Sequence, residues 1–189
     1  SVYSEWKIRE KLYSKEIEKK DVDEIIKFLK QHDLINDDAY ILDFLYEAEE
    51  KGYGKHKIIQ KLNEKGIFQE KINKIKFSDS KGLKKAKALL PSLEKKYVNY
   101  NFQNKKRHIH DAYIRLGYES HIIEQIMSLI KQTPIDKELS LLEKDYSKYK
   151  KKSKDKYCDN EYKQKEYLIS KLLNLGYKYK DIIRIMEDD

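Results

Sequence analysis

Apolar residues recur along this chain at intervals of three and four, which is typical of helices that bury one face. No segment shows the sustained alternation of a strand. A glycine followed by a bulky apolar residue separates amphipathic stretches at Gly66, Gly117 and Gly176. Such a glycine commonly ends a helix in a left-handed conformation. The pattern predicts an all-α protein.

The positions around these glycines repeat. Apolar residues stand eight and four places before each glycine, and six and nine places after it. They are Ile58, Leu62, Ile72 and Ile75 around Gly66; Ile109, Tyr113, Ile123 and Ile126 around Gly117; and Leu168, Leu172, Ile182 and Ile185 around Gly176. The template also fits the N-terminal region, with Glu16 in place of the glycine. Shared spacing of this kind indicates repeated helical units.

A further amphipathic stretch precedes each later pair, at 37–51, 80–97 and 135–150. We therefore predict an elongated, curved array of tandem three-helix repeats. The expected repeats are 1–33 (incomplete, with the last two helices only), 34–78, 79–132 (the most basic) and 133–189.

Two local features refine this expectation. Pro91 lies within the stretch 80–97 and predicts a kink or a short break there. The longest and most polar connections are expected at 98–104 and 151–158. The lysine-rich run Lys148–Lys156 has no apolar period, so we expect a helix end followed by a solvated loop.

The net charge of +8 comes from 41 basic and 33 acidic residues, and its distribution is uneven. Residues 81–115 hold ten basic and two acidic residues, a net +8, while the flanking regions nearly cancel. A local basic surface attracts polyanions because neutralised phosphates release counterions. The candidate DNA- or filament-binding residues are Lys84, Lys85, Lys87, Lys95, Lys96, Lys105, Lys106, Arg107 and Arg115.

Aromatic residues interleave with this basic segment and allow two interpretations. Exposed rings beside lysine or arginine can stack on the bases of single-stranded DNA. Tyrosines can equally fill thin helical cores. Tyr113 and Tyr118 follow the repeat template, so we assign them to the core. For Tyr100 and Phe102 both interpretations stay open.

The sequence carries no recognisable catalytic chemistry. It has no phosphate-binding glycine loop, no zinc-ligand spacing and no nucleophile patterned with a base. His121 stands isolated, and helix capping explains Asp37 and Asp38. We expect a non-enzymatic protein without catalytic residues, metal site or cofactor. The single cysteine and the lack of long apolar runs favour a cytoplasmic protein that does not contact membranes.

Several segments together resemble the RecX family of recombinase regulators. They are Ser4–Leu12, Leu34–Asp38, Lys51–Gly54 and Lys65–Ile67, in this order and spacing. The residues that carry the family motif are Arg9, Asp37, Asp38, Gly52, Tyr53, Gly54 and Gly66. Lys55 departs from the family, which often has proline there. Acidic Glu47, Glu49 and Glu50 also stand where more basic character is expected.

We expect a monomer, and the resemblance implies that it binds the RecA filament on single-stranded DNA. It also implies inhibition or modulation of RecA ATPase, strand exchange and coprotease activity in homologous recombination, DNA repair and the SOS response. RecA and DNA would then be the partners. The alternative is a general DNA-binding helical protein that uses the basic segment without RecA.

Overall fold

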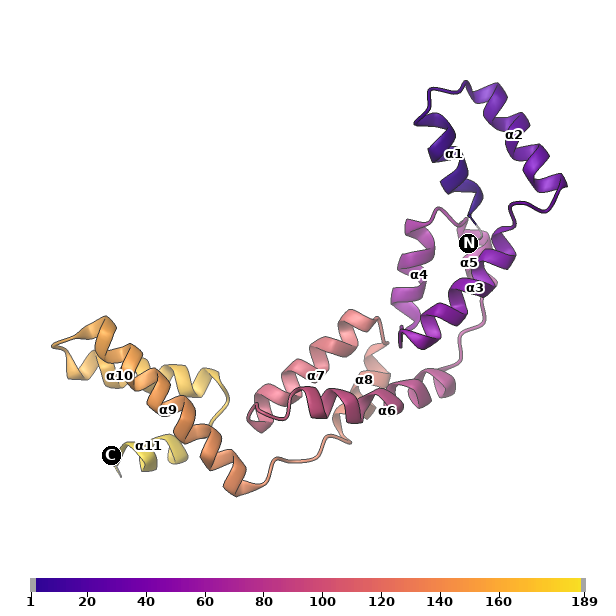
Figure 1. Ribbon diagram of the computed structural model, residues 1–189. Coiled ribbons are helices and arrows are strands. Elements are labelled where there is room, and N and C mark those ends of the chain that lie inside the picture. Colours follow the sequence, from indigo (N-terminus) through magenta and orange to yellow (C-terminus); the bar gives the residue numbers. More distant parts are fainter. Residues whose placement is uncertain (1–2, 188–189) are drawn as a thin grey trace. The chain divides into compact units, whose positions relative to one another are not determined.

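The computed structural model describes residues 3–187, which form eleven α-helices and no strand (Figure 1). The all-α prediction is therefore confirmed for these residues. They form two compact units. The first holds the described residues up to 88 together with 113–124, and the second holds 89–112 together with those from 125 onward. None of the described helices is both long and apolar enough to cross a membrane.

The first unit contains five complete helices. They are α1 (Glu5–Tyr13), α2 (Lys19–Gln31), α3 (Asp37–Glu50), α4 (Lys55–Glu64) and α5 (Gln69–Asn73). Val22, Ile26 and Ile35 form one apolar cluster, onto which side chains of α1 pack. A second cluster joins α3, α4 and α5, and fully buried Leu62 belongs to it.

Three helices each contribute residues to both units. They are α6 (Asp79–Lys96), α7 (Phe102–Leu116) and α8 (Ser120–Met127). The template positions Ile109, Tyr113, Ile123 and Ile126 on α7 and α8 are all buried. Tyr113 also donates a 2.7 Å hydrogen bond from its hydroxyl to the carbonyl of Ala86. The prediction that Tyr113 belongs to the core is confirmed.

The second unit ends with α9 (Ile135–Tyr157), α10 (Glu161–Asn174) and α11 (Tyr179–Glu187). Helix α9 runs alongside α10 (Figure 1). Their shared apolar cluster contains the buried residues Leu142, Tyr146, Leu168, Leu172, Tyr177 and Ile182. Three of these, Leu168, Leu172 and Ile182, are template positions.

The glycine turns share one hydrogen-bond geometry. Gly66, Gly117 and Gly176 have φ values of 68°, 80° and 90°. After each of them, the next residue donates its N–H to the carbonyl five residues before it, as Ile67 does to Leu62 at 3.1 Å. This bond and the apolar contact that accompanies it define the Schellman motif. Glu16, with φ 60°, makes the corresponding turn in the first unit. The predicted left-handed turns are therefore confirmed.

The predicted loop at 151–158 is wrong, because α9 continues to Tyr157. The run from Lys148 to Lys156 lies within this helix instead of ending it. Ser153 is buried where an apolar residue would be expected, and its hydroxyl donates to the carbonyl of Lys150. A polar residue at a buried position concealed the apolar period of this segment.

Two other local expectations need correction. Helix α7 begins at Phe102, so the preceding connection is shorter than the predicted 98–104. Helix α6 continues through Pro91, which contradicts a short break there, while a kink stays a prediction. Pro91 and Lys87 are both exposed, so water can satisfy the Lys87 carbonyl that proline leaves without a donor. The boundaries at 33, 78 and 132 and the curved, elongated shape stay predictions.

We expect Leu62→Ala to lower the free energy of unfolding by about 2–5 kcal/mol, because it removes a fully buried side chain. The matched control is Leu42→Ala on α3, whose side chain is 59% exposed, and it should change stability by less than about 0.5 kcal/mol. Urea denaturation followed by circular dichroism measures both. Equal losses for the two variants would contradict the core assignment.

Candidate nucleic-acid interface

Helix α6 carries its lysines on the side opposite its buried residues. Ala86 and Leu90 are buried, whereas Lys84 and Lys87 are exposed. No ion pair within the described residues engages either lysine. Lys95 and Lys96 further along the helix are exposed as well, and the ammonium of Lys96 lies over the ring of Tyr97. These four side chains are available to a polyanion.

Lys85 differs from the neighbouring lysines because its ammonium group already forms an ion pair within the protein. Its ammonium lies 3.0 Å from a carboxylate oxygen of Glu49 on α3, and its side chain is only partly exposed. Glu49 is one of the acidic residues on α3 that stand where more basic character was expected. It thus neutralises one lysine of the basic segment. Lys85 consequently contributes less to any phosphate-binding surface than Lys84 does.

In the second unit, Lys105 serves the packing of α7. It is buried, donates a 2.8 Å hydrogen bond to the Lys131 carbonyl and lies over the ring of Phe102. Arg107 is exposed, and one of its nitrogens donates to the Asn104 side chain at 2.6 Å. We therefore exclude Lys105 from the candidate binding residues. Partly exposed Lys106 and exposed Arg107 remain candidates in the second unit, and exposed Arg115 remains one in the first.

The aromatic residues beside α7 divide by exposure. Tyr97 is buried and stacks on His108, with ring centroids 5.1 Å apart. Tyr100 is 43% exposed and contacts His108 with its edge. Phe102 is partly buried beneath Lys105. Among these rings, Tyr100 is the most open to a base, and whether it stacks on one stays a prediction.

Tyr118 follows the core prediction in the first unit, where it is buried and packs edge-on against Tyr113. Burial raises the pKa of Tyr118 to about 12. Its hydroxyl has no hydrogen-bond partner among the described residues. Tyr118 also lines a cavity of about 590 Å³, whose rim includes Lys81 and Lys84. Exposed lysines of α6 therefore border a hollow with a partly apolar lining.

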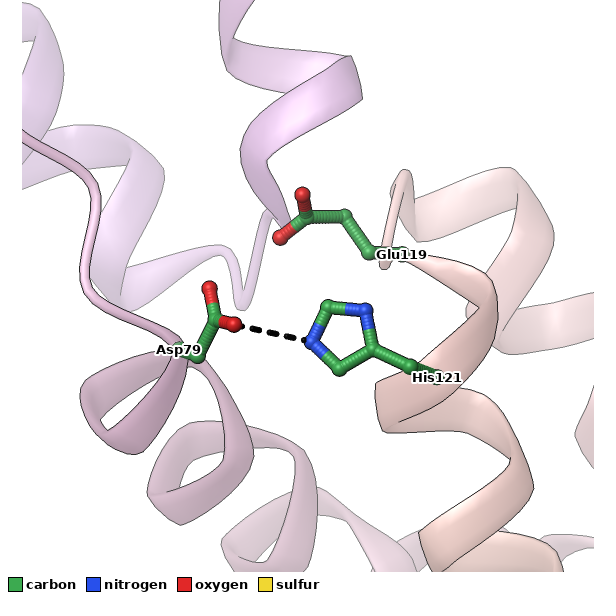
Figure 2. Close-up of side chains that lie close together, drawn as sticks. All are labelled: Asp79, Glu119 and His121. Carbon is green, nitrogen blue, oxygen red and sulfur yellow. Dashed lines mark ion pairs between the residues drawn. The ribbon is translucent and has the colours of Figure 1, made fainter.

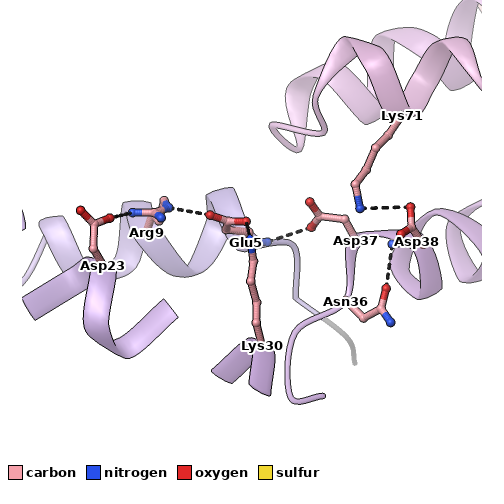
Figure 3. Close-up of polar contacts among 8 residues, drawn as sticks. All are labelled: Glu5, Arg9, Asp23, Lys30, Asn36, Asp37, Asp38 and Lys71. Atoms are coloured by element: carbon pink, nitrogen blue, oxygen red, sulfur yellow. Dashed lines mark hydrogen bonds and ion pairs between the residues drawn. The ribbon is translucent and has the colours of Figure 1, made fainter. Parts of the chain in front are cut away.

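The motif residues near the N-terminus form a polar network that ties three helices together (Figure 3). The Glu5 N–H, at the start of α1, donates to a carboxylate oxygen of Asp37 at 3.0 Å. The Glu5 carboxylate in turn accepts from Arg9 at 2.9 Å and pairs with Lys30 of α2 at 2.6 Å. Arg9 also reaches Asp23 on α2 at 2.6 Å. Arg9 and Asp37 thus have a structural role.

Charge pairing in this network shifts two pKa values. Burial alone raises the pKa of Glu5, but hydrogen bonds from Lys30 and Arg9 outweigh it and hold that pKa below its ordinary value. Hydrogen bonds to Asp23 and then to Glu5 raise the pKa of the Arg9 guanidinium. Both groups therefore stay charged at neutral pH.

Asp38 and the preceding Asn36 stabilise the start of α3. The Asn36 side chain accepts hydrogen bonds from the N–H groups of Asp38 and Ala39, which is the usual geometry of an N-cap. The carboxylate of Asp38 lies 3.0 Å from the Lys71 ammonium on α5 (Figure 3). The interpretation of Asp37 and Asp38 as helix-start residues is consistent with these contacts.

The motif Gly52-Tyr53-Gly54 brings two backbones into direct contact within the first unit. Gly52 ends α3 with φ 67°, and Tyr53 then donates its N–H to the Ala48 carbonyl. The Gly54 N–H donates to the Leu116 carbonyl at 2.7 Å, and the His56 N–H donates to the Gly117 carbonyl at 3.0 Å. These bonds fix the start of α4 against the turn between α7 and α8.

This contact leaves no space for side chains. A Cβ atom at Gly54 would lie 2.5 Å from the Gly117 oxygen, and one at Gly117 would collide with the backbone of Lys57. A Cβ at Gly66 would meet the indole of Trp6. Close packing of neighbouring segments therefore explains the motif glycines Gly54 and Gly66, and the left-handed turn conformation explains Gly52 and adds to the need for glycine at Gly66.

Three ionisable side chains converge where α6 and α8 begin (Figure 2). Asp79, Glu119 and His121 offer oxygen and nitrogen atoms that lie within 4.8 Å of one another, a set that could hold a divalent cation. The interpretation of His121 as an isolated histidine is wrong, since its Nε2 lies 3.1 Å from a carboxylate oxygen of Asp79. Because these residues lie far apart in the sequence, no local sequence pattern indicates that their side chains are close together.

The positively charged side chain of Lys55 already interacts with this cluster. The Lys55 ammonium lies 2.7 Å from a carboxylate oxygen of Glu119, and this hydrogen bond raises the pKa of Lys55. Carboxylates at the starts of helices also interact favourably with the helix dipoles. We therefore assign Asp79, Glu119 and His121 to the packing of α6, α8 and the start of α4.

Comparison with known proteins gives the same family from sequence and from structure. The chain is 28% identical over 182 residues to the regulatory protein RecX of Streptococcus agalactiae serotype Ia, an alignment that covers 90% of this chain and 66% of that protein. It is 33% identical over 54 residues to RecX of Salmonella heidelberg, covering 29% of this chain and 32% of that protein. No family model matches the chain.

The fold also matches a solved structure. The crystal structure of RecX from Lactobacillus salivarius superposes with a TM-score of 0.59 at 26% identity, covering 69% of this chain and 88% of that one. The chain thus resembles RecX proteins both in sequence and in fold. The prediction of an all-α fold of three-helix repeats is confirmed by this match.

The relatives in these alignments are named as regulatory proteins. The chain spans 66% of the length of the streptococcal RecX. In this chain, the residues that carry the resemblance to RecX include Arg9, Asp37, Gly54 and Gly66, and all four make contacts between helices or turns. These motif residues thus hold neighbouring helices and turns together, and none of them is one of the exposed lysines of α6.

We expect Gly54→Ala to lower the free energy of unfolding by about 1–3 kcal/mol, because the new Cβ would press on the Gly117 backbone. Gly82→Ala on α6 is the control, since its Cβ would meet only the end of the Ile122 side chain at 3.0 Å. That change should be neutral or stabilising, by up to about 1 kcal/mol. Thermal unfolding compares the two, and a harmless Gly54→Ala would contradict the proposed contact.

Glu5→Gln should destabilise the protein by about 1–3 kcal/mol at pH 7, because it removes charged hydrogen bonds to Arg9 and Lys30. The Glu5 pKa is lower in the folded than in the unfolded chain, so this stabilisation is present above the ordinary value of 4.5. It should fade as the pH falls below that value. Urea unfolding at pH 7 and at pH 3 measures the difference.

The control for this experiment is Glu10→Gln on the same helix. Within residues 3–187, the ion pair of Glu10 is with Lys7 at the exposed surface, and such pairs contribute less than about 1 kcal/mol. A Glu5→Gln effect that stayed the same at both pH values would show that the destabilisation does not come from the charge of Glu5.

Proposed function

We propose that this chain regulates RecA, as a monomer in the cytoplasm, by binding the RecA filament on single-stranded DNA. It would thereby inhibit or modulate RecA ATPase, strand exchange and coprotease activity during recombination and DNA repair. The observation that carries this proposal is the alignment of 90% of the chain with a RecX regulatory protein. The motif order between residues 4 and 67 supports it as well.

The exposed basic residues are the proposed contacts to the DNA of the filament. Helix α6 supplies four lysines that are exposed, and α7 adds Lys106, Arg107 and Arg115. The four lysines are Lys84, Lys87, Lys95 and Lys96. A lysine or arginine that neutralises a phosphate releases a counterion, so binding through these residues weakens as salt rises. Family-motif residues, by contrast, support the fold of the surface.

Titrating the chain into RecA on single-stranded DNA and measuring ATPase at two salt concentrations tests the proposal. We expect inhibition at amounts well below one chain per RecA, because a protein that caps or spans a filament affects many subunits. Lys84→Glu with Lys87→Glu and Lys95→Glu should raise the half-inhibitory concentration by about tenfold or more.

The matched control reverses three exposed lysines of α2, Lys19, Lys20 and Lys27, which changes the net charge equally. It should shift the half-inhibitory concentration by less than about twofold if the effect depends on α6 and not on total charge. ATPase and filament length that stay unchanged at saturating amounts of the chain would overturn the proposal.

A general DNA-binding role is the second candidate, and the unpaired, exposed lysines of α6 favour it. It predicts inhibition only when the chain saturates the DNA, with loss of the effect at higher salt. The ATPase titration separates the two functions, since only action on the filament gives inhibition far below the DNA-saturating amount.

A further inference from the structure

Helix α9 of the second unit presents a second basic face, apart from the basic segment 81–115. Lys144, Lys148 and Lys151 are all exposed and follow one another at spacings of four and three residues. Residues at these spacings lie on the same side of a helix. We call these three residues the α9 lysine stripe.

The opposite side of α9 explains why this stripe faces outward. Leu142, Tyr146 and Ser153 are buried against the rest of the second unit. The lysines of the stripe therefore extend from a helix that is held in place by its packing, and not from a mobile loop. An ordered row of charges loses less conformational entropy on binding than a disordered one.

The stripe is not neutralised by neighbouring acids. Among the ion pairs of residues 3–187, none involves Lys144, Lys148 or Lys151. The nearby Tyr149 ring lies under two ammonium groups, those of Lys148 at 5.4 Å and Lys152 at 5.7 Å. These cation–π contacts hold positive charge at the surface without cancelling it.

The spacing of the stripe matches a strand of nucleic acid. From Lys144 to Lys151 the helix rises by about 10 Å, at 1.5 Å per residue. A nucleic-acid strand in a duplex carries one phosphate per 3.4 Å along the axis, so this length faces about three phosphates. We propose that the α9 lysine stripe binds the phosphate backbone of a nucleic-acid strand as a second contact surface.

This proposal does not depend on RecA, so it is tested with the full chain and DNA alone. A fluorescein-labelled DNA duplex serves as the probe, and its anisotropy gives the affinity over a series of salt concentrations. Replacing Lys144, Lys148 and Lys151 by glutamine should weaken binding. It should also reduce the slope of log K against log salt by about 3, because each neutralised phosphate of a DNA duplex contributes about 0.9 to that slope.

Two matched variants make the result decisive. Replacing Lys19, Lys20 and Lys27 of α2 by glutamine removes the same total charge and should leave the slope within about 0.5 of the original. Replacing the stripe by arginine keeps the charges and should restore binding. Circular dichroism shows whether each variant retains its helices, which glutamine and arginine both favour.

The proposal is overturned if the glutamine stripe variant keeps the original affinity and slope. It is also overturned if the α2 variant weakens binding as much, since net charge would then account for the affinity, or if the unaltered chain does not bind the duplex. Because no RecA is present, none of these results bears on the ATPase inhibition expected of the proposed function.

Discussion

The close approach of two backbones at Gly54 and Gly117 is the constraint on which the first unit depends. Hydrogen bonds from the Gly54 and His56 N–H groups reach the carbonyls of Leu116 and Gly117. This places the start of α4 directly on the turn that ends α7, where no side chain could fit. The position of α4 then sets that of Leu62, the buried centre of the cluster shared by α3, α4 and α5.

Much of the fold was predictable because its signals are local. In each left-handed turn, the residue after the turn donates its N–H to the carbonyl five residues before it. Apolar residues at fixed distances from the turn then pack against one another. Even Glu16, which lacks the freedom of glycine, adopts the turn that the template assigned to it. Ser153 hid the continuation of α9, because a buried serine does not register as an apolar position.

The candidate site was less predictable, since it depends on contacts between distant residues. The sequence placed Lys85 and Lys105 in one basic group with Lys84. In the structure Glu49 pairs with Lys85, and the packing of α7 buries Lys105. Likewise His121 meets Asp79 across a separation that no sequence pattern indicates. A count of charges therefore locates a basic region without telling which charges are free.

Taken together, the motif residues hold helices and turns to one another while exposed lysines lie on the outer faces of α6 and α9. This division of roles is consistent with the proposed binding to a polymer of protein and DNA, which the exposed charges would contact at several points. Weak charged contacts at several points add up when they are held on one ordered chain.

Direct binding to the filament tests this account most plainly. The affinity of the labelled chain should be measured for RecA filaments on single-stranded DNA and for the same DNA without RecA, at two salt concentrations. If the chain acts on the filament, we expect at least tenfold tighter binding to the filament and a preference that persists at the higher salt. Equal affinities for the two, falling together as salt rises, would contradict it.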